Sequence, residues 1–314
     1  MACDFTEDRA KNSQPPTTQS DCSPMDNSNP WNKLRSNKTA FFALAGFLGT
    51  FIGDLVTEPF EIHRGDTKSF ALMILHTATW VAFLAGGLSP SLALAGSLYN
   101  RRPYMPLKFI IMAILGALGG ALSGGLIQIM YSAGFMLGVK QGTPLQFIFQ
   151  CFTWGLIGGT VGGILGGTVP NLKWWRAIGA GLVGGSIGCA GFLTICSMLP
   201  EVIGRLLGVG VMGAAIGLSI VVAERLAREA SLEVIWAPNE TTTVNLGERS
   251  VFIGGGREDD VFIRGFPARH AGITLKQGRV EYTEAASGRQ TTLKDGSRLE
   301  IGKLTLVVHT DAKS

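Results

Sequence analysis

The stretch FIIMAILGALGGALSGGLIQIMYSAGF, residues 109–135, decides the fold of this 314-residue chain. It contains no charged side chain and exceeds the roughly 20 apolar residues that an α-helix needs to cross a bilayer. The chain has six such mostly apolar stretches, which predict spans at 39–57, 70–98, 109–135, 146–169, 177–199 and 203–223. We therefore expect a helical multi-pass membrane protein whose first partner is the lipid bilayer.

The rest of the sequence divides around these spans. Residues 1–38 are rich in Ser, Asn, Pro and Asp and predict a disordered N-terminus, because they cannot bury enough apolar surface to fold. A six-span domain covers residues 39–223, and a short charged helical linker follows at 224–231. Residues 232–310 alternate between polar and apolar side chains as strands do, and residues 311–314 form a tail.

Basic side chains in the short loops predict the orientation of the spans. Most of them lie before the first span, in alternate loops and after the last span: Lys33, Arg35, Lys38, Arg101, Arg102, Lys108, Lys173, Arg176, Arg225 and Arg228. Since such segments stay in the cytoplasm, both termini are expected there, in a protein of the inner (plasma) membrane. The remaining loops hold fewer basic residues, among them Lys140 and Arg205. Lys38, Lys108 and Arg176 each open a span at intervals of 70 and 68 residues, which predicts three tandem helical hairpins.

Glycines recur every four residues in several spans. The rows are Gly116, Gly120 and Gly124 in the third span, Gly155, Gly159, Gly163 and Gly167 in the fourth, and Gly184 and Gly188 in the fifth. Residues four apart share a helix face, so each row forms a flat groove that lets another backbone approach closely. These grooves either pack the helices of one chain or assemble copies of the chain into a homo-oligomer. A dinucleotide-binding loop is excluded, because no strand precedes these glycines.

Few polar groups lie inside the spans. Asp54 is expected near the end of the first span, at the outer interface, His76 stands alone in the second span, and Gln128 in the third is neutral. An ionisable residue inside a membrane indicates a functional site by default, but no row of acids or bases forms a proton relay here. A hydrated cavity lined by these residues would favour a channel or transporter, and a sealed bundle would favour an anchor.

The sequence lacks the spacing of known catalytic and metal-binding motifs. The five cysteines are scattered without a CxxC or Cys/His pair, and the four histidines form no HExxH motif. Neither a GxSxG motif nor a Walker lysine is present. We therefore predict no catalytic residue, no metal and no cofactor, and the protein is not expected to be an enzyme.

Nine short strand-like runs follow the last span. They are Leu232–Trp236, Thr241–Leu246, Ser250–Gly254, Asp260–Ile263, Gly272–Lys276, Arg279–Thr283, Arg289–Leu293, Arg298–Ile301 and Lys303–His309. Turn signals such as Gln277-Gly278 and Asp295-Gly296 separate them, and this pattern predicts an all-β sandwich or barrel. From residue 232 to the end the chain has 11 Lys and Arg and 11 Asp and Glu. This balance argues against nucleic acid as a partner, because nucleic-acid binding needs a concentrated basic face.

Four landmarks of this region occur in a known order: Ile253-Gly254, Asp260-Val261, His270-Ala271-Gly272-Ile273 and the run from Leu293 to Gly302. Together they resemble the forkhead-associated (FHA) domain, whose pattern reads I-G-R, D-I, S-R-x-H-A, N-G-T and L-x-D-G-D-x-I-x-I-G. The resemblance covers about 80 residues and implies an FHA-like β-sandwich at residues 232–310. The whole layout resembles bacterial multispan membrane proteins with a cytoplasmic C-terminal FHA domain.

In the FHA family, loops at one end of the sandwich bind phosphothreonine, so the resemblance implies a phosphopeptide site. On this chain the candidate residues are Gly254, Gly255, Gly256, Arg257, Arg269, Ser287 and Arg289, while His270 and Gly296 match structural positions. Gly255, Pro267 and Ala268 stand where the family has arginine, serine and arginine. Arg257 and Arg269 either take over the contact with the phosphate or are ordinary surface arginines.

Two functions remain open from the sequence. The first is a membrane-anchored adaptor, whose cytoplasmic FHA-like domain docks a partner protein that carries a phosphorylated threonine in the phospho-dependent version. The second is a channel or transporter regulated by that domain. The first is preferred at this point, because the charged residues inside the spans are so few.

Overall fold

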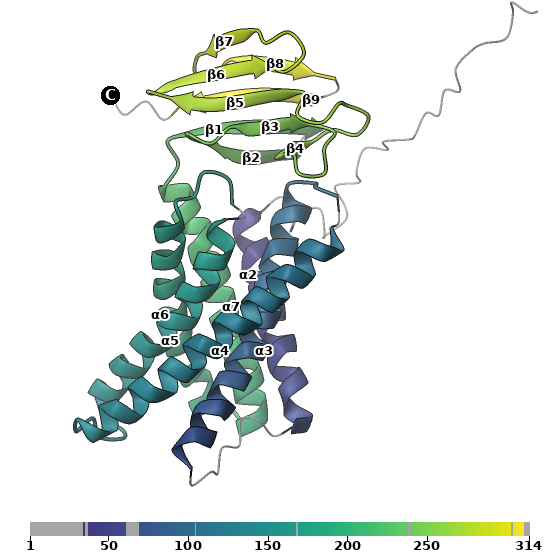
Figure 1. Cartoon of the computed structure of the whole chain (residues 1–314). Helices are drawn as coiled ribbons and strands as arrows, with labels where there is room; N and C mark the ends of the chain where they lie inside the picture. Colours follow the sequence, from purple (N-terminus) through teal and green to yellow (C-terminus); the bar gives the residue numbers. More distant parts are fainter. Residues whose placement is uncertain are drawn as a thin grey trace, which may run out of the picture.

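The computed structural model of the protein describes residues 34, 37–60, 69–103, 105–167, 169–237, 240–302 and 304–310. Most of the predicted N-terminal segment 1–38 and the tail 311–314 lie outside the described residues. The described part consists of a bundle of long helices with a β domain on one end (Figure 1). We call that end of the bundle the β-domain end and the opposite one the distal end.

Six long helices occupy the predicted positions. They are α2 (Lys38–Thr57), α3 (Phe70–Tyr99), α4 (Pro106–Met136), α5 (Pro144–Gly166), α6 (Trp174–Met198) and α7 (Glu201–Leu226), with a 3₁₀ turn η1 (Glu58–Phe60) after α2. Each is long and apolar enough to cross a membrane, and large apolar side chains such as Leu118 and Leu122 are exposed on the bundle. In length and composition the chain is a multi-pass membrane protein, as predicted.

Local sequence determines where several helices begin. Asn37 Oδ1 accepts a hydrogen bond from the Ala40 amide at 3.2 Å and so caps α2. Thr143 Oγ1 accepts one from the Gln146 amide at 3.3 Å, and Pro144 then opens α5, where its missing N–H costs nothing. These spans therefore start where a capping side chain or a proline takes the place of an intrahelical partner.

The six helices form a closed ring. Helices that follow one another in the chain pack side by side, and α2 packs against α7 to close the circle. The most extensive packing joins α3 to α4 and α5 to α6, helices from different predicted hairpins. The α4–α5 pair, itself a predicted hairpin, packs least among the neighbours. This looser pair flanks the cavity described below.

Glycines bring the helix backbones of the ring together. The predicted packing glycines face neighbouring helices of the same chain: Gly116, Gly120 and Gly124 face α3, Gly155, Gly159 and Gly163 face α6, and Gly184 and Gly188 face α7. A Cβ atom added at Gly116 would lie only 2.4 Å from the Ala85 carbonyl oxygen. Gly167 follows α5, and an added Cβ there meets nothing within 4 Å. The geometry thus supports packing within one chain, the first of the two alternatives.

The β domain contains two sheets. Its strands are β1 (Ala230–Ala237), β2 (Glu240–Leu246), β3 (Val251–Gly254), β4 (Val261–Phe262), β5 (Ala271–Lys276), β6 (Arg279–Glu284), β7 (Gln290–Leu293), β8 (Arg298–Ile301) and β9 (Leu304–Thr310). One sheet has the order β2-β1-β9-β8, and the other has the order β4-β3-β5-β6-β7. All pairs are antiparallel except β3 and β4. The predicted all-β region is confirmed, and each strand lies within two residues of its predicted bounds.

The two sheets share one core. Fully buried side chains from both meet in it, among them Leu232 and Leu306 from one sheet and Ile253 and Ile273 from the other. Alternation along the strands points these residues inward, which is why the pattern was readable in the sequence. The turn Gln277-Gly278 adopts positive φ at both residues, 49° and 75°, and closes the β5–β6 hairpin.

Polar contacts hold the β domain against the helices. Arg102, between α3 and α4, pairs with Asp260 at 2.7 Å. Asn171, between α5 and α6, donates to the carbonyl oxygens of Asn245 and Arg249 at 3.0 and 3.2 Å. Two separate loops of the bundle therefore bind the same domain, which fixes its position at the end of the ring.

A buried ion pair reinforces this junction where the ring closes. Lys38 at the start of α2 lies 2.5 Å from Glu224 near the end of α7, and its ammonium lies 5.0 Å from the centre of the Tyr99 ring. The Asn245 side chain donates to the Glu224 carbonyl oxygen at 3.1 Å. The helices and the β domain thus share one polar network. These contacts hold the surfaces on either side of the junction in a fixed arrangement.

Candidate functional site

A cavity of about 690 Å³ lies inside the helical ring. Helices α3 to α7 contribute to its lining, which includes His76, Thr77, Trp80, Gln128, Tyr131, Gln150, Trp154, Phe192, Cys196 and Arg205. These residues belong to the distal halves of their helices, so the cavity lies away from the β domain. Small-molecule sites occupy about 300–1,000 Å³, and the cavity falls within this range. We call it the distal cavity.

One wall of the distal cavity contains a buried ion pair. Asp54 of α2 is fully buried, and its Oδ2 lies 3.3 Å from Nε of Arg205 of α7, whose side chain lines the cavity. Arg205 also pairs with Glu58, and the Trp80 indole N–H donates to Asp54 Oδ1 at 2.7 Å. A buried carboxylate requires partners of this kind, so the network joins the first, second and last spans at the distal end.

The network corrects two expectations from the sequence. Asp54 is expected at the outer interface, and it does lie in the last turn of α2, but it is enclosed by protein. Arg205 is assigned to a loop from its sequence context, whereas the structure places it inside α7 and 7 % exposed. Each charge can enter the apolar interior because the other is there. In the sequence, the only indication of this pair is that Asp54 lies at the distal end of one span and Arg205 at the distal end of another.

Hydrogen-bonding side chains line another part of the cavity. Thr77 Oγ1 donates to Gln128 Oε1 at 2.9 Å, and Gln128 Nε2 donates to Ser132 Oγ at 3.3 Å. The His76 Nδ1 atom is buried and has no hydrogen-bond partner within the described part of the chain. Buried polar atoms are almost always paired, so His76 Nδ1 is an exception that the surrounding described side chains do not satisfy. His76 and Gln128, both predicted as intramembrane polar groups, therefore lie at one cavity.

Aromatic rings complete the lining. The Trp80 and Trp154 rings meet edge to face with centroids 5.6 Å apart, and Trp154 lies 4.9 Å from Phe192. Tyr131 accepts a hydrogen bond on its hydroxyl oxygen from Gln146 at 2.8 Å, which holds its ring in place. Rigid aromatic walls with a few oriented polar groups are typical of small-molecule sites. These aromatic residues could not be identified as a site from the sequence, because Trp and Tyr are also enriched at the membrane interface.

An apolar plug separates the distal cavity from the β domain. Between the cavity and the β-domain end, α3 and α7 carry the side chains of Leu84, Leu88, Leu92, Ile216 and Ile220, all at most 1 % exposed and in contact within one cluster. Close-packed aliphatic side chains of this kind exclude water. The bundle is therefore neither fully sealed nor an open pore, but a ring with a cavity at one end.

The predicted phosphate loop, residues 254–259, is closed on itself. The Gly255 amide donates to the Pro267 carbonyl oxygen at 2.9 Å, and the carboxylate of Asp259 accepts from the amides of Gly256 and Arg269 at 2.7 and 3.0 Å. Asp259 is 2 % exposed. An internal carboxylate thus occupies two amide donors beside the predicted phosphate site, a role for Asp259 that its spacing in the sequence does not indicate.

Asp259→Ala is expected to destabilise this loop by about 2 kcal/mol, because two partly buried amides lose a charged acceptor. Hydrogen exchange of the Gly256 and Arg269 amides in the full chain should become faster, while exchange in β1 and β9 stays slow. Glu258→Ala is the matched control, since Glu258 is exposed and forms none of these bonds. Unchanged exchange in Asp259→Ala would show that the carboxylate does not hold the loop.

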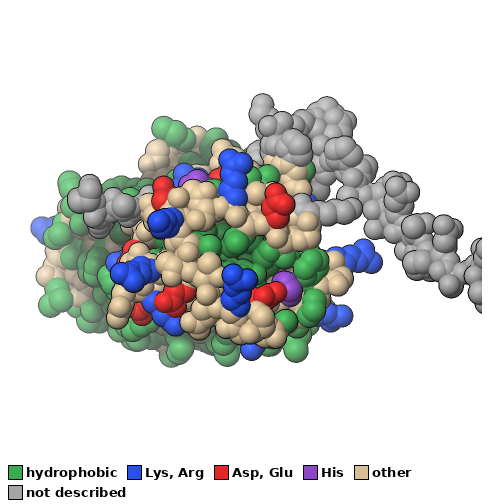
Figure 2. All heavy atoms as spheres, turned by 90° about the horizontal axis from the view of Figure 1, so that it is seen from above, with side chains coloured by type: hydrophobic (Ala, Val, Ile, Leu, Met, Phe, Trp, Pro, Cys, Tyr) green, Lys and Arg blue, Asp and Glu red, His purple; other side chains and the backbone are tan. Residues whose placement is uncertain are grey.

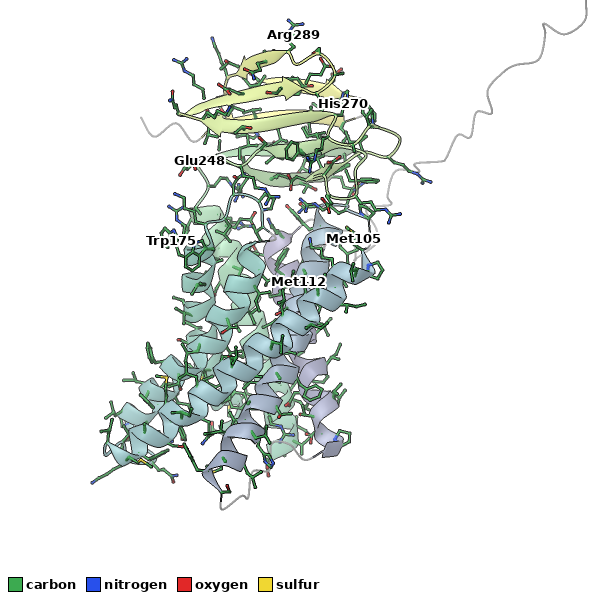
Figure 3. The ribbon with its side chains drawn as sticks, viewed as in Figure 1. Met105, Met112, Trp175, Glu248, His270 and Arg289 are labelled. Carbon is green, nitrogen blue, oxygen red and sulfur yellow. The ribbon has the colours of Figure 1, made fainter. Side chains whose placement is uncertain are left out.

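The other predicted phosphopeptide residues divide between two places. Arg257 and Arg269 line a groove between the β domain and the helices. Figure 3 shows Arg289 on the side of the β domain that faces away from the helices. Ser287 Oγ donates to Glu284 at 2.6 Å and accepts from the Arg289 amide at 3.2 Å, so it closes its own turn. The seven candidates therefore do not surround one pocket.

The two positions matched to structural FHA residues lie at turns of the β domain. The His270 ring packs edge-on against Phe266 with centroids 5.2 Å apart, and the His270 carbonyl oxygen accepts from the Ala285 amide at 3.0 Å. Gly296 has a φ of 72°, a conformation that glycine adopts without strain. His270 thus connects the loop before β5 to the turn after β6.

The chain matches no protein-family model, no curated protein and no solved structure. Among the described residues, no group of three or more His, Cys, Asp or Glu side chains could hold a metal ion.

Proposed function

We propose that the protein is a membrane transport protein that binds a small polar solute in the distal cavity and is regulated from the opposite end by its β domain. The observation that carries this proposal is the distal cavity itself, which lies among helices α3 to α7 and is lined by His76, Gln128 and Arg205, the basic member of a buried ion pair. Intramembrane ionisable groups that face a cavity mark solute pathways in membrane proteins. An anchor would need no such cavity.

The arrangement suggests how transport would proceed. The solute enters from the distal side and binds between aromatic walls, with hydrogen bonds to His76 and Gln128. The apolar plug blocks further passage, so release at the β-domain end requires the helices to move relative to one another. The loosely packed α4–α5 pair is the part of the ring where such movement disrupts the fewest contacts. The β domain binds the α3–α4 loop through Arg102 and is therefore placed to influence this movement.

Cys196 offers a direct test of the cavity, because its side chain lines it. In a variant with Cys3, Cys22, Cys151 and Cys189 replaced by serine, a membrane-impermeant thiol reagent should modify Cys196 only from the side opposite the β domain. A solute that binds the cavity should slow this reaction and raise the unfolding temperature, and Gln128→Ala should weaken both effects.

The matched control retains Cys189 as the sole cysteine, with Cys196 replaced by serine. Cys189 lies on the same helix and is fully buried, so it should not react. If Cys196 is also unreactive from both sides, the cavity is not connected to water and the transport proposal is wrong. Reaction from the β-domain side alone would contradict the proposed entry route.

A second candidate function is a membrane-anchored adaptor, in which an FHA-like β domain docks a cytoplasmic partner protein. The face of the β domain seen in Figure 2 supports it, because helices do not cover that face and basic and acidic side chains are interspersed on it. The two-sheet arrangement and the order of the four sequence landmarks support the FHA-like assignment. Phosphothreonine dependence of such docking is tested by the peptide titration described below.

The proposed location is the inner membrane with the β domain in the cytoplasm. Basic residues at the β-domain end of the helices support this orientation, among them Arg101, Arg102, Lys108, Lys173 and Arg176. The Trp174 and Trp175 side chains are 67 % and 56 % exposed at the same end, as expected for residues at a membrane–water interface.

A further inference from the structure

A second space lies between the β domain and the β-domain end of the helices. It is a groove of about 520 Å³ bounded by the α3–α4 loop and the start of α4 on one side and by the β2–β3 and β3–β4 loops on the other. Figure 3 places Met105 and Met112, two of its lining residues, at the top of α4 just below the β domain. We call it the junction groove. It is separate from the distal cavity at the other end of the bundle.

The junction groove is strongly basic. Five basic side chains line it, namely Arg102, Lys108, Arg249, Arg257 and Arg269, against two acidic ones, Glu258 and Asp260. Asp260 is already paired with Arg102 at 2.7 Å. Within the described ranges, Lys108, Arg249 and Arg257 form no ion pair. These three cations outnumber Glu258, the other acidic side chain in the lining, so the groove carries a net positive charge.

The same groove has an apolar wall that continues into the membrane. Met105, Leu107 and Ile111 line its lower part, and Leu107 is 67 % exposed. Below them the outer face of α4 carries further exposed apolar side chains, Ile114 and Leu118. Since Trp175 lies at the same end of the bundle (Figure 3), this wall stands where lipid headgroups meet acyl chains.

We propose that the junction groove binds an anionic phospholipid, with the headgroup phosphate among Lys108, Arg249 and Arg257 and the acyl chains along the outer face of α4. Guanidinium groups contact phosphate oxygens through paired hydrogen bonds, and basic pockets at the end of membrane helices recognise anionic headgroups in this way. Of the two alternatives left open for Arg257 by the sequence, this proposal takes the phosphate contact and assigns the phosphate to a lipid. This inference is independent of any solute in the distal cavity.

The geometry favours a lipid over a phosphopeptide. The groove opens beside the exposed apolar face of α4, which a polar peptide would leave unused. The amides of Gly255 and Gly256 already donate to the Pro267 carbonyl oxygen and to Asp259, so these two glycine amides are not free to contact a phosphate. Ser287 and Arg289, the remaining phosphopeptide candidates, do not line the groove.

The test uses the full chain in detergent, titrated with dioleoylphosphatidylglycerol or dioleoylphosphatidylcholine, with bound lipid counted by native mass spectrometry. Phosphatidylglycerol should bind roughly tenfold or more tightly than phosphatidylcholine, and the triple variant Lys108→Gln, Arg249→Gln, Arg257→Gln should lose this preference. The control triple variant Arg279→Gln, Arg289→Gln, Arg298→Gln removes three exposed arginines outside the groove and should retain it. On the wild-type chain, raising the salt concentration about tenfold should weaken phosphatidylglycerol binding alone.

Three results would overturn the proposal. Equal binding of the two lipids by the wild-type chain would exclude recognition of the anionic headgroup. Inorganic phosphate that displaces phosphatidylglycerol at equal concentration would assign the groove to free phosphate. A phosphothreonine peptide that binds the wild-type chain in preference to its unphosphorylated form, and loses that binding in the groove variant, would assign it to a phosphopeptide.

Discussion

Arg205→Met is expected to destabilise the protein by about 3–5 kcal/mol, because it leaves the fully buried Asp54 carboxylate without its cationic partner. The Trp80 indole N–H still donates to Asp54, but one neutral donor does not replace a guanidinium. Thermal unfolding of the purified chain in detergent measures the effect. Distal-cavity binding should be lost together with stability, since Arg205 forms part of the wall.

The double variant Asp54→Asn, Arg205→Met separates charge from packing. It removes both charges, retains a side chain that can accept the Trp80 hydrogen bond, and should recover most of the lost stability. Lys140→Met removes an exposed charge at the same end of the bundle and should have little effect. Wild-type stability in Arg205→Met would mean that this ion pair does not stabilise the buried Asp54 side chain.

Gly181→Ala is expected to destabilise the bundle by about 3 kcal/mol, the upper end of the usual cost of overpacking. An added Cβ would lie 1.9 Å from the Gly158 carbonyl oxygen, so α5 and α6 could not keep their present separation. Backbone atoms cannot swing aside as a flexible side chain can. The unfolding temperature in detergent and the yield of folded protein should both fall.

Gly179→Ala provides the comparison on the same helix. An added Cβ at Gly179 meets nothing within 4 Å, so the substitution should be neutral or slightly stabilising through helix propensity. Similar effects at Gly179 and Gly181 would indicate that glycine acts in α6 through backbone flexibility and not through close helix contact.

Local patterns were sufficient to predict the elements of this fold. The run at 109–135 is uncharged and mostly apolar, and the helix over it differs from the prediction only by a few terminal residues. Strands such as Arg298–Ile301 were predicted because side-chain alternation and the turn at Gly296 are properties of neighbouring residues. Gly116 could be assigned to a packing face, but the partner helix could not, because spacing along one helix does not identify its neighbour.

The candidate sites depend on contacts between distant residues, and these were not predictable. Asp54 and Arg205 are 151 residues apart in the chain, so neither suggests the other until the ring closes. His76 and Gln128 were recognised as polar groups in spans, but a common cavity requires knowledge of how α3 and α4 pack. For Arg257 the sequence left a phosphate contact and an ordinary surface position open, because the surface that this side chain faces depends on how the β domain sits on the helices.

The closure of the ring by α2 and α7 has a consequence for biogenesis. The first and last spans to leave the ribosome contact each other through Gly46 and Gly213 and through Asp54 and Arg205. During synthesis the Asp54 carboxylate therefore enters the membrane region long before its partner is made. The set of partners around Asp54 is therefore complete only after α7 has been made, and the ring closes with the last of these six spans.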